Sequence, residues 1–229
     1  MTIVQRLPRE SAREYAIRIL KENIISLELA PGSMLSENEI SSQLNLSRTP
    51  VREALIELAK VNIVEIFPQK GSRIKLIDYN LVEESYFFRM VLENAVVAIL
   101  CNSEGELNLS ALEDNLKLQE FYLNEDQTEK LLELDNLFHK ELFARASKQL
   151  CYSWLMDGMT IHLDRVRVLS LNTVKDIKIV SGHKAILKAI QDRNGGEAIE
   201  QMTAHLSRYK IDEKEIRIKY PDYFDRGSN

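Results

Sequence analysis

The 229-residue chain is 45% hydrophobic and has a net charge of −5, so it can bury one large core or two modest ones, and we expect two domains. No segment approaches the roughly 20 uninterrupted apolar residues that a membrane helix needs, and the charged N-terminal residues lack the apolar core of a signal peptide. We therefore expect a soluble, cytoplasmic protein. The two cysteines have no metal-type spacing, and reduced, packed thiols are expected for both.

The net charge is unevenly distributed along the chain. Residues 1–76 contain 11 Lys and Arg against 9 Asp and Glu, a balance of +2, while residues 77–229 contain 19 against 26, a balance of −7. Binding to DNA phosphates requires clustered Lys and Arg side chains. If the protein binds DNA, the contact surface is therefore expected in the first part of the chain.

Three short helices are predicted at the N-terminus. The capping boxes of residues 11–14 and 36–39 begin the first two helices, and Ser47 is the predicted N-cap of a third over residues 48–60. Pro50 lies in the first turn of the third helix, where the missing N–H costs nothing.

A β-hairpin is predicted directly after the third helix. Residues 63–67 and 72–77 have the pattern of two short strands around a Pro-Gln-Lys-Gly turn at residues 68–71. Three helices followed by a hairpin predict a winged helix-turn-helix domain, which we assign to residues 1–77.

The third helix has the pattern expected of a helix that enters the DNA major groove. Arg48 and Arg52 are four residues apart near its N-terminus, so both lie on one face and could contact guanine or phosphate. Ser47, Thr49 and the free N–H groups of the helix start could hold a phosphate. In the hairpin, Lys70 and Arg73 could follow the DNA backbone. The spacing is also compatible with ordinary solvated arginines on an amphipathic helix.

An all-helical domain is predicted over residues 78–229. Six helices are expected near residues 80–102, 106–124, 128–147, 150–170, 176–193 and 195–219. Asn194 is expected to cap the last of them, with Glu197 at the third position, so that the final two helices form a hairpin pair. The tail over residues 221–229 is expected to be frayed.

One helix of this second domain carries a candidate metal-binding pair. Asp135 and His139 are four residues apart and project from one face. His183 and His205 lie on the last two predicted helices and could converge on that pair. A carboxylate with imidazoles suits Zn²⁺, Mn²⁺, Ni²⁺ or Fe²⁺. By itself, however, an Asp and a His at this spacing are more commonly part of a solvated or hydrogen-bonded helix face.

The N-terminal motifs resemble a known family. Residues 31–37 have the sequence PGSMLSE and residues 44–55 the sequence LNLSRTPVREAL, closely similar to the signature of the GntR family of bacterial regulators. The resemblance implies operator binding as a homodimer, with the two arginines of the recognition helix contacting DNA and with Lys70 and Gly71 at the tip of the wing.

Two positions depart from the family pattern. Asn62 stands where the family usually has Gly, and since Asn also tolerates a left-handed backbone, the turn into the wing is expected to survive. Asn38 stands where some relatives have an Arg that contacts DNA, which puts that contact in doubt.

The second half of the chain resembles the FCD ligand-binding domain of the FadR-like branch of the same family. The resemblance is carried by residues 89–93, 135–139, 182–190 and 204–206. It implies that a divalent metal is bound inside a helical bundle and that a small carboxylate effector completes the coordination. The implied ligands are Asp135, His139, His183 and His205.

Two further residues of this domain are interpreted from the same resemblance. Arg89 is the candidate clamp for an effector carboxylate, against the simpler interpretation of a local ion pair with Glu93 four residues later. His162 matches no part of the metal pattern and is expected to be structural.

The sequence thus predicts a mainly α-helical, DNA-binding transcriptional regulator, a repressor rather than an activator, that is controlled by an organic acid at a metal site. A metal-dependent enzyme acting on a small organic acid is the first alternative, although the chain has no His-Glu-x-x-His motif and no Gly-rich phosphate loop. A direct metal sensor without an organic effector is the second. We therefore expect no enzyme activity and no membrane partner.

Overall fold

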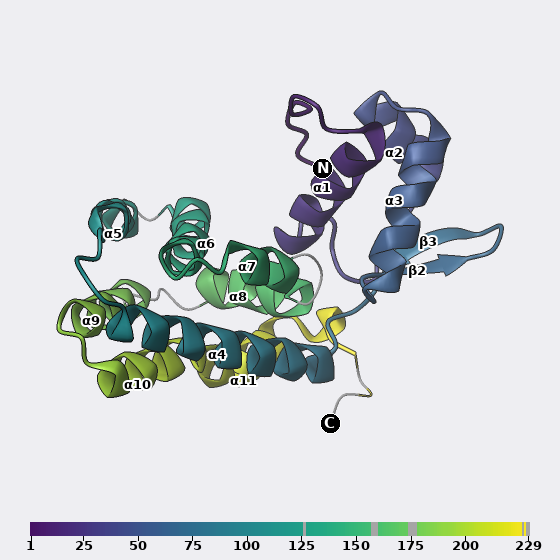
Figure 1. Cartoon of the computed structure of the whole chain (residues 1–229). Helices are drawn as coiled ribbons and strands as arrows, with labels where there is room; N and C mark the ends of the chain where they lie inside the picture. The colour runs from purple at the N-terminus through teal and green to yellow at the C-terminus, as the bar shows by residue number, and fades with distance from the viewer. Residues whose placement is uncertain (126, 157–159, 174–177, 226, 228–229) are drawn as a thin grey trace. The chain divides into compact units, whose positions relative to one another are not determined.

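The computed structural model describes residues 1–125, 127–156, 160–173, 178–225 and 227, and it confirms the predicted mainly helical fold (Figure 1). The chain forms two compact units. The N-terminal unit contains Met1–Glu83, Gly158–Val168 and Ile216–Asn229, and the C-terminal unit contains Glu84–Asp157 and Leu169–Glu215. The N-terminal unit therefore includes more of the chain than the predicted residues 1–77, and a domain boundary after residue 77 stays a prediction.

Capping residues set the limits of the three N-terminal helices, α1 (Ala12–Ile25), α2 (Glu37–Leu44) and α3 (Arg48–Lys60). The Ser11 capping box is present, and the side chain of Ser36 accepts a hydrogen bond from the N–H of Glu39. Helix α2 ends because Asn45 adopts a left-handed backbone with φ of 52°. Ser47 is the N-cap of α3, but its side chain makes no capping hydrogen bond to the described residues.

A three-stranded antiparallel sheet follows α3. Strands β1 (Met34–Leu35), β2 (Val64–Phe67) and β3 (Gly71–Ile74) lie in the order β1-β3-β2, and the β2–β3 hairpin is the predicted wing. No sequence pattern predicts β1, because two residues are too few to show an alternation of buried and exposed side chains. Asn62 has φ of 60°, so the expected left-handed turn into the wing is present. Gly71 has φ of 97°, and a Cβ there would lie 3.1 Å from the carbonyl oxygen of Leu35.

The core of the N-terminal unit lies between α1, α3 and the sheet. Its centre is formed by apolar side chains that are at most 2% exposed, including Ala16, Ile19, Leu20, Val51, Leu55, Leu58, Ile63, Val64 and Ile74. Ile161, at the start of α8 (Ile161–Thr173), belongs to the same cluster. A segment that begins 87 residues after the end of the wing (Ile74 to Ile161) therefore completes this core.

Polar contacts also join α8 to both ends of the wing. The Nε2–H of His162 donates to the carbonyl oxygen of Asn62 at 3.2 Å, and its Nδ1 accepts from the N–H of Asp78 at 3.2 Å. The guanidinium of Arg165 donates to the carbonyl oxygen of Lys75 and to His162 Nδ1, both at 2.8 Å. These bonds require an uncharged His162.

Residues 221–225 include a short 3-10 helix, η2 (Pro221–Tyr223), and a β-bridge, so the expectation of a frayed tail was wrong there, while residues 226, 228 and 229 lie outside the described residues. Phe224 forms a parallel bridge with Ile77, is 4% exposed, and packs against the ring of Tyr79 with centroids 5.4 Å apart. The guanidinium of Arg217 lies 4.0 Å from the centre of the Tyr79 ring. Burial of the Phe224 ring holds this segment in place, although most residues around Phe224 in the sequence are polar.

Helices form the rest of the structure, and two of the six predicted ones are each divided in two. Beside α8, their bounds are α4 (Tyr79–Asn102), α5 (Ser110–Asn124), α6 (Thr128–Arg145), α7 (Gln149–Trp154), α9 (Lys178–Gln191), α10 (Gly195–Leu206) and α11 (Tyr209–Lys219).

The two corrections concern the predicted helices over residues 150–170 and 195–219. In the structure, α7 and α8 replace the single helix predicted over residues 150–170, and α10 and α11 replace the one predicted over residues 195–219. Helix α10 ends at Ser207, whose hydroxyl donates to the carbonyl oxygen of Thr203 at 2.7 Å, while the apolar spacing continues across the break. Asn194 caps α10 as predicted, accepting from the N–H of Glu197 at 3.2 Å.

The apolar faces of α4, α5, α6, α9 and α10 form the core of the C-terminal unit. Its members that are at most 1% exposed are Val97, Leu100, Leu112, Phe138, Leu142, Phe143, Leu155, Ile186, Ile190, Ala198 and Met202. Among the described residues, every helix is too short or too polar to cross a membrane.

The buried imidazole of His162 makes the stability of the N-terminal unit depend on pH. Burial, and secondarily the charge of Arg165, lowers the pKa of His162 from 6.5 to about 3. Because the folded pKa is lowered, the neutral imidazole contributes its stability fully above pH 6.5, and this contribution is lost as the pH falls toward 3. Lowering the pH from 6.5 to 5 is expected to cost about 2 kcal/mol from this group.

The measurement is urea unfolding of the metal-free protein and of His162→Gln between pH 7 and pH 5. A glutamine can still donate to Asn62 and accept from Asp78 but does not titrate. The variant should therefore show a smaller loss of unfolding free energy, and equal losses in the two proteins would contradict the assignment.

Candidate metal centre and nucleic-acid interface

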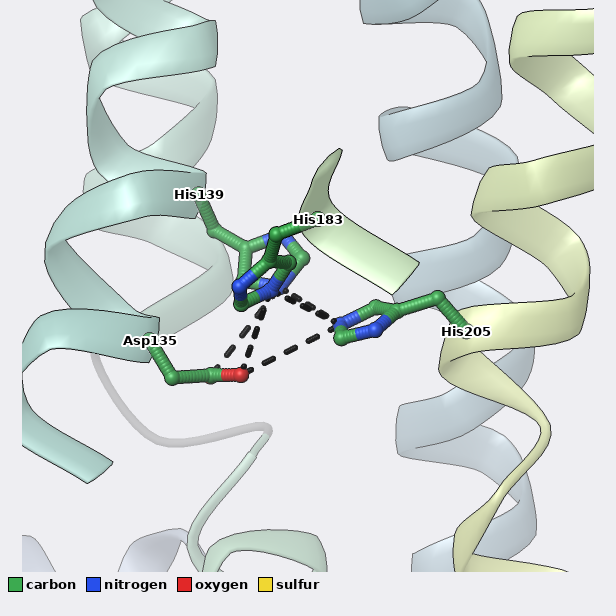
Figure 2. A group of neighbouring side chains, drawn as sticks. All are labelled: Asp135, His139, His183 and His205. Carbon is green, nitrogen blue, oxygen red and sulfur yellow. Dashed lines mark hydrogen bonds and ion pairs between the residues drawn. The ribbon is translucent and has the colours of Figure 1, made fainter. Parts of the chain in front are cut away.

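Four predicted ligands from three helices converge in the C-terminal unit (Figure 2). Asp135 and His139 come from α6, where their spacing of four residues places them on one face, and His183 and His205 come from α9 and α10. One donor atom from each side chain lies within 4.8 Å of all the others. The sequence left this convergence open, and the packing of α9 against α10 produces it.

Three of the distances between donor atoms are close to those around a divalent metal ion, whereas Asp135 lies 3.9 Å from His205 Nε2 and 4.0 Å from His139 Nε2. His205 Nε2 lies 3.1 Å from His139 Nε2 and 3.2 Å from His183 Nε2, and His183 Nε2 lies 3.4 Å from Asp135 Oδ1. Nitrogen ligands at 2.0–2.1 Å around a tetrahedral zinc ion would be separated by about 3.3 Å. Three imidazoles and a carboxylate are also a ligand set that Mn²⁺, Ni²⁺ and Fe²⁺ accept.

Three of the four candidate ligands are buried, and His205 is of intermediate exposure with a side chain that is 6% exposed. Asp135 is 4% exposed, His139 1% and His183 0%, and the ring of Phe138 stacks on His183 with centroids 4.1 Å apart. Burial lowers the pKa of His183 to about 3 and the pKa of His205 well below its usual range. Both imidazoles are therefore neutral at pH 7, which is the form that binds metal.

A buried acid and an arginine lie behind His139. Its Nδ1 contacts one carboxylate oxygen of Glu93, and the other oxygen contacts Nε of Arg89. Burial would raise the pKa of Glu93, but its contacts with Arg89 and His139 outweigh burial and hold the pKa at about 2. The Arg89–Glu93 ion pair considered from the sequence is present and buried, while a role of Arg89 toward an effector stays a prediction.

Two residues that the sequence pattern does not single out contact the rings of the candidate ligands. Glu93 was considered only as a partner of Arg89, and Gln119 of α5, whose Oε1 lies 2.8 Å from His183 Nδ1, was not considered. Gln119 is fully buried on the same face as Leu112 and Leu116. A polar residue within that apolar stripe was the available signal.

Close approach of α9 to α10 is possible because residue 182 is glycine. A Cβ on Gly182 would lie 3.0 Å from His205 Nδ1. This nitrogen is buried and has no hydrogen-bond partner among the described residues. The glycine therefore leaves room for the imidazole of His205 beside the other ligands.

The predicted DNA contacts lie on two exposed parts of the winged helix. At the N-terminus of α3, Ser47, Arg48, Thr49 and Arg52 are all exposed. Arg52 forms a two-point ion pair with Glu37 of α2, with Nη2 2.8 Å from one oxygen and Nε 3.0 Å from the other. Exposed pairs of this kind contribute little stability and can exchange for a phosphate or a base.

The second part is the wing. Lys70 is exposed at the β2–β3 turn, and Gly71 begins β3. Arg73 is exposed, pairs with Glu65 at 2.7 Å and lies 5.2 Å from the centre of the Phe67 ring. The structure thus gives the predicted residues accessible positions, and their contacts with DNA stay predictions.

Comparisons with protein families match both halves of the chain. Residues 12–74 match the family described as bacterial regulatory proteins, gntR family, and residues 84–208 match the FCD domain.

Similar proteins cover nearly the whole chain. The HTH-type transcriptional repressor RspR of Escherichia coli is 33% identical over 226 residues, which are 98% of this chain and 99% of RspR. The Nta operon transcriptional regulator of Aminobacter aminovorans is 30% identical over 81% of this chain and 86% of its own length. The solved structure of E. coli McbR/YncC has a TM-score of 0.76 at 17% identity, over 92% of this chain and 99% of that one, which shows a common fold.

The requirement for glycine at position 182 can be tested by adding one methyl group there. Alanine would normally stabilise a helix relative to glycine by up to about 1 kcal/mol. Because the added Cβ of Gly182→Ala must displace His205, we instead expect the overpacked variant to lose about 1–3 kcal/mol of unfolding free energy. The measurement is denaturant unfolding of the metal-free protein.

Gly196→Ala is the matched control, since a Cβ at this position of α10 has only an ordinary contact at 3.7 Å. It should not destabilise the protein. A Gly182→Ala protein as stable as this control would show that the close approach of α9 to α10 places no constraint on His205.

Proposed function

Because this chain belongs to the GntR family of bacterial regulatory proteins and carries an FCD domain, we propose that it is a transcriptional repressor whose affinity for its operator is controlled by a small organic acid bound at a metal centre. The convergence of Asp135 with three buried histidines carries this proposal. The similar proteins are regulators and not enzymes, so the chain is a DNA-binding regulator and the metalloenzyme alternative is not supported.

The operator is proposed to have two-fold symmetry and to be bound by a homodimer, since symmetric dimers place two recognition helices in successive major grooves. Helix α3 would enter the groove with Arg48 and Arg52 toward the bases or phosphates, and the N–H groups at its start would hold a phosphate. Lys70 and Arg73 would follow the backbone from the wing. Repression, rather than activation, is supported by the name of the relative RspR.

Charge at the centre favours an anionic effector. As a metal ligand Asp135 is a carboxylate, and Glu93 is ionised because its pKa is about 2. Together with Arg89, these buried side chains carry two negative charges against one positive charge, and a divalent ion reverses the sign of the total. One carboxylate would then neutralise the site, and such an ion would offer it a coordination position.

Arg89 is the proposed second contact of the effector. Its guanidinium is buried and contacts Glu93, whose other carboxylate oxygen contacts His139 of the candidate metal centre. An arginine that shares the carboxylate of Glu93 can also pair with a second carboxylate. Effector binding would then shift the populations of domain arrangements in the dimer and so change operator affinity.

Selection of binding sites from fragmented genomic DNA by the metal-loaded protein tests the proposed function. We expect enrichment of a short two-fold sequence at a fixed salt concentration. Titrating that complex with metal alone and then with small carboxylates separates an effector-controlled regulator from a direct metal sensor. A complex that responds fully to metal and not to any carboxylate would favour the sensor.

The recognition helix and the wing are expected to respond differently to substitution. Arg48→Ala should weaken binding to the selected operator by about 1–3 kcal/mol and reduce discrimination at one base pair, whereas Lys70→Ala should weaken binding to all sequences and reduce the salt slope by about 1. Fluorescence anisotropy with operator and scrambled DNA at several salt concentrations measures both effects.

Lys60→Ala is the matched control for loss of one charge, since Lys60 is exposed at the opposite end of α3 and pairs with Glu57 at 3.0 Å. Its affinity should stay close to that of the original protein. Equal effects of Arg48→Ala and Lys60→Ala would contradict the proposed role of α3.

Loss of a metal ligand should separate sensing from DNA binding. Asp135→Ala and His183→Ala are expected to lose the bound metal and the response to carboxylates, while operator binding by the winged helix persists. Metal content by mass spectrometry and operator titrations with and without effector give the two readouts.

His162→Gln is the control, because His162 is buried in the N-terminal unit and is not among the four converging ligands. It should keep its metal and its response. If Asp135→Ala and His183→Ala also kept both, the metal-centred mechanism would be wrong.

A further inference from the structure

A chain of three hydrogen bonds leads from the backbone of α6 to the imidazole of His183. Asn115 Nδ2 donates to the carbonyl oxygen of Leu134 at 3.1 Å, and Gln119 Nε2 donates to Asn115 Oδ1 at 2.5 Å. Gln119 Oε1 lies 2.8 Å from His183 Nδ1. Asn115 and Gln119 are four residues apart on α5, so one helix face carries both amides.

The direction of every bond in this chain is determined at its first member. A backbone carbonyl oxygen can only accept, so the Leu134 oxygen requires the NH₂ group of the Asn115 amide. Asn115 therefore presents its oxygen to Gln119, and Gln119 must present its NH₂ group to Asn115 and its oxygen to His183. The hydrogen of the neutral imidazole is then on Nδ1, and Nε2 is left with a free lone pair.

We propose that Asn115 and Gln119 are positioning residues that hold His183 in the tautomer whose Nε2 can bind a metal ion. The inference rests on the proposed metal centre and adds two residues to it that do not touch the ion. Asn115 would then control the proton position on the His183 ring through Gln119, without bonding to His183 itself.

Comparison with His139 shows why two residues are needed to fix the proton position on His183. His139 Nδ1 contacts the carboxylate of Glu93, which only accepts when ionised, so one residue suffices to orient that ring. The amide of Gln119 can present either a donor or an acceptor. Because Gln119 is fully buried, water cannot correct a reversed amide, and Asn115 must select its orientation.

Zinc affinity tests the proposal. In Asn115→Ala the amide of Gln119 is free to reverse, and we expect Zn²⁺ binding, measured by competition with a chromophoric chelator, to weaken by about 10-fold to 100-fold. Adding Gln119→Glu, which presents only acceptor oxygens to His183, should restore the affinity. Asn124→Ala, at the exposed end of α5, is the matched control and should bind Zn²⁺ as the original protein does.

The proton position is measured independently of any metal by the ¹⁵N chemical shifts of His183 in the metal-free protein. The original protein and the double variant should show a protonated Nδ1 and a bare Nε2, and Asn115→Ala should show both tautomers. An unchanged tautomer together with unchanged Zn²⁺ affinity in Asn115→Ala would overturn the proposal.

The two readouts also separate this inference from the proposed function. If the original protein binds no metal ion while Asn115→Ala still changes the His183 tautomer, the metal centre is wrong and the control of the tautomer by Asn115 stands. If the metal binds and the tautomer does not respond, the metal centre stands and the positioning role is wrong.

Discussion

Burial of three imidazoles around one carboxylate is the constraint on which the C-terminal unit depends. In a solvent-free interior the charged form of histidine is disfavoured, so His183 and His205 stay neutral and bring ring nitrogens within 3.2 Å of one another. Bare nitrogen lone pairs at that distance repel unless a proton or a metal ion lies between them. The buried acceptors Glu93 and Gln119 orient the rings, and the missing side chain of Gly182 leaves room for one of them.

A second constraint concerns the N-terminal unit, which the first 77 residues do not complete. Ile161 belongs to its apolar core, His162 and Arg165 donate to backbone oxygens at both ends of the wing, and Phe224 forms a bridge with Ile77. In the sequence, the segment that contains Ile161, His162 and Arg165 lies between the two parts of the C-terminal unit, and the segment that contains Phe224 follows both parts. The N-terminal unit is therefore built partly from chain that lies within and after the C-terminal unit in the sequence.

Local chemistry was sufficient for much of the prediction. Serine caps, a left-handed asparagine and the apolar spacing of α3 identified the winged helix, because caps and turns depend on residues within four positions of one another. The same locality explains the errors. The apolar pattern continues through the breaks after α7 and α10, and the two-residue strand β1 exists only through its pairing with β3.

By itself, the sequence determined the helix caps, the exposed basic residues at the start of α3, the Asp135–His139 pair on one face of α6 and the family to which the protein belongs. Only the tertiary structure decided that His183 and His205 meet that pair and that Glu93 and Gln119 orient the rings. It also decided that Phe224 packs against Ile77 and Tyr79, just after the wing. The physical reason is the separation along the sequence of the residues that interact. Helical periodicity relates residues three or four apart, whereas the contact between Gln119 and His183 joins residues 64 positions apart through the packing of separate helices.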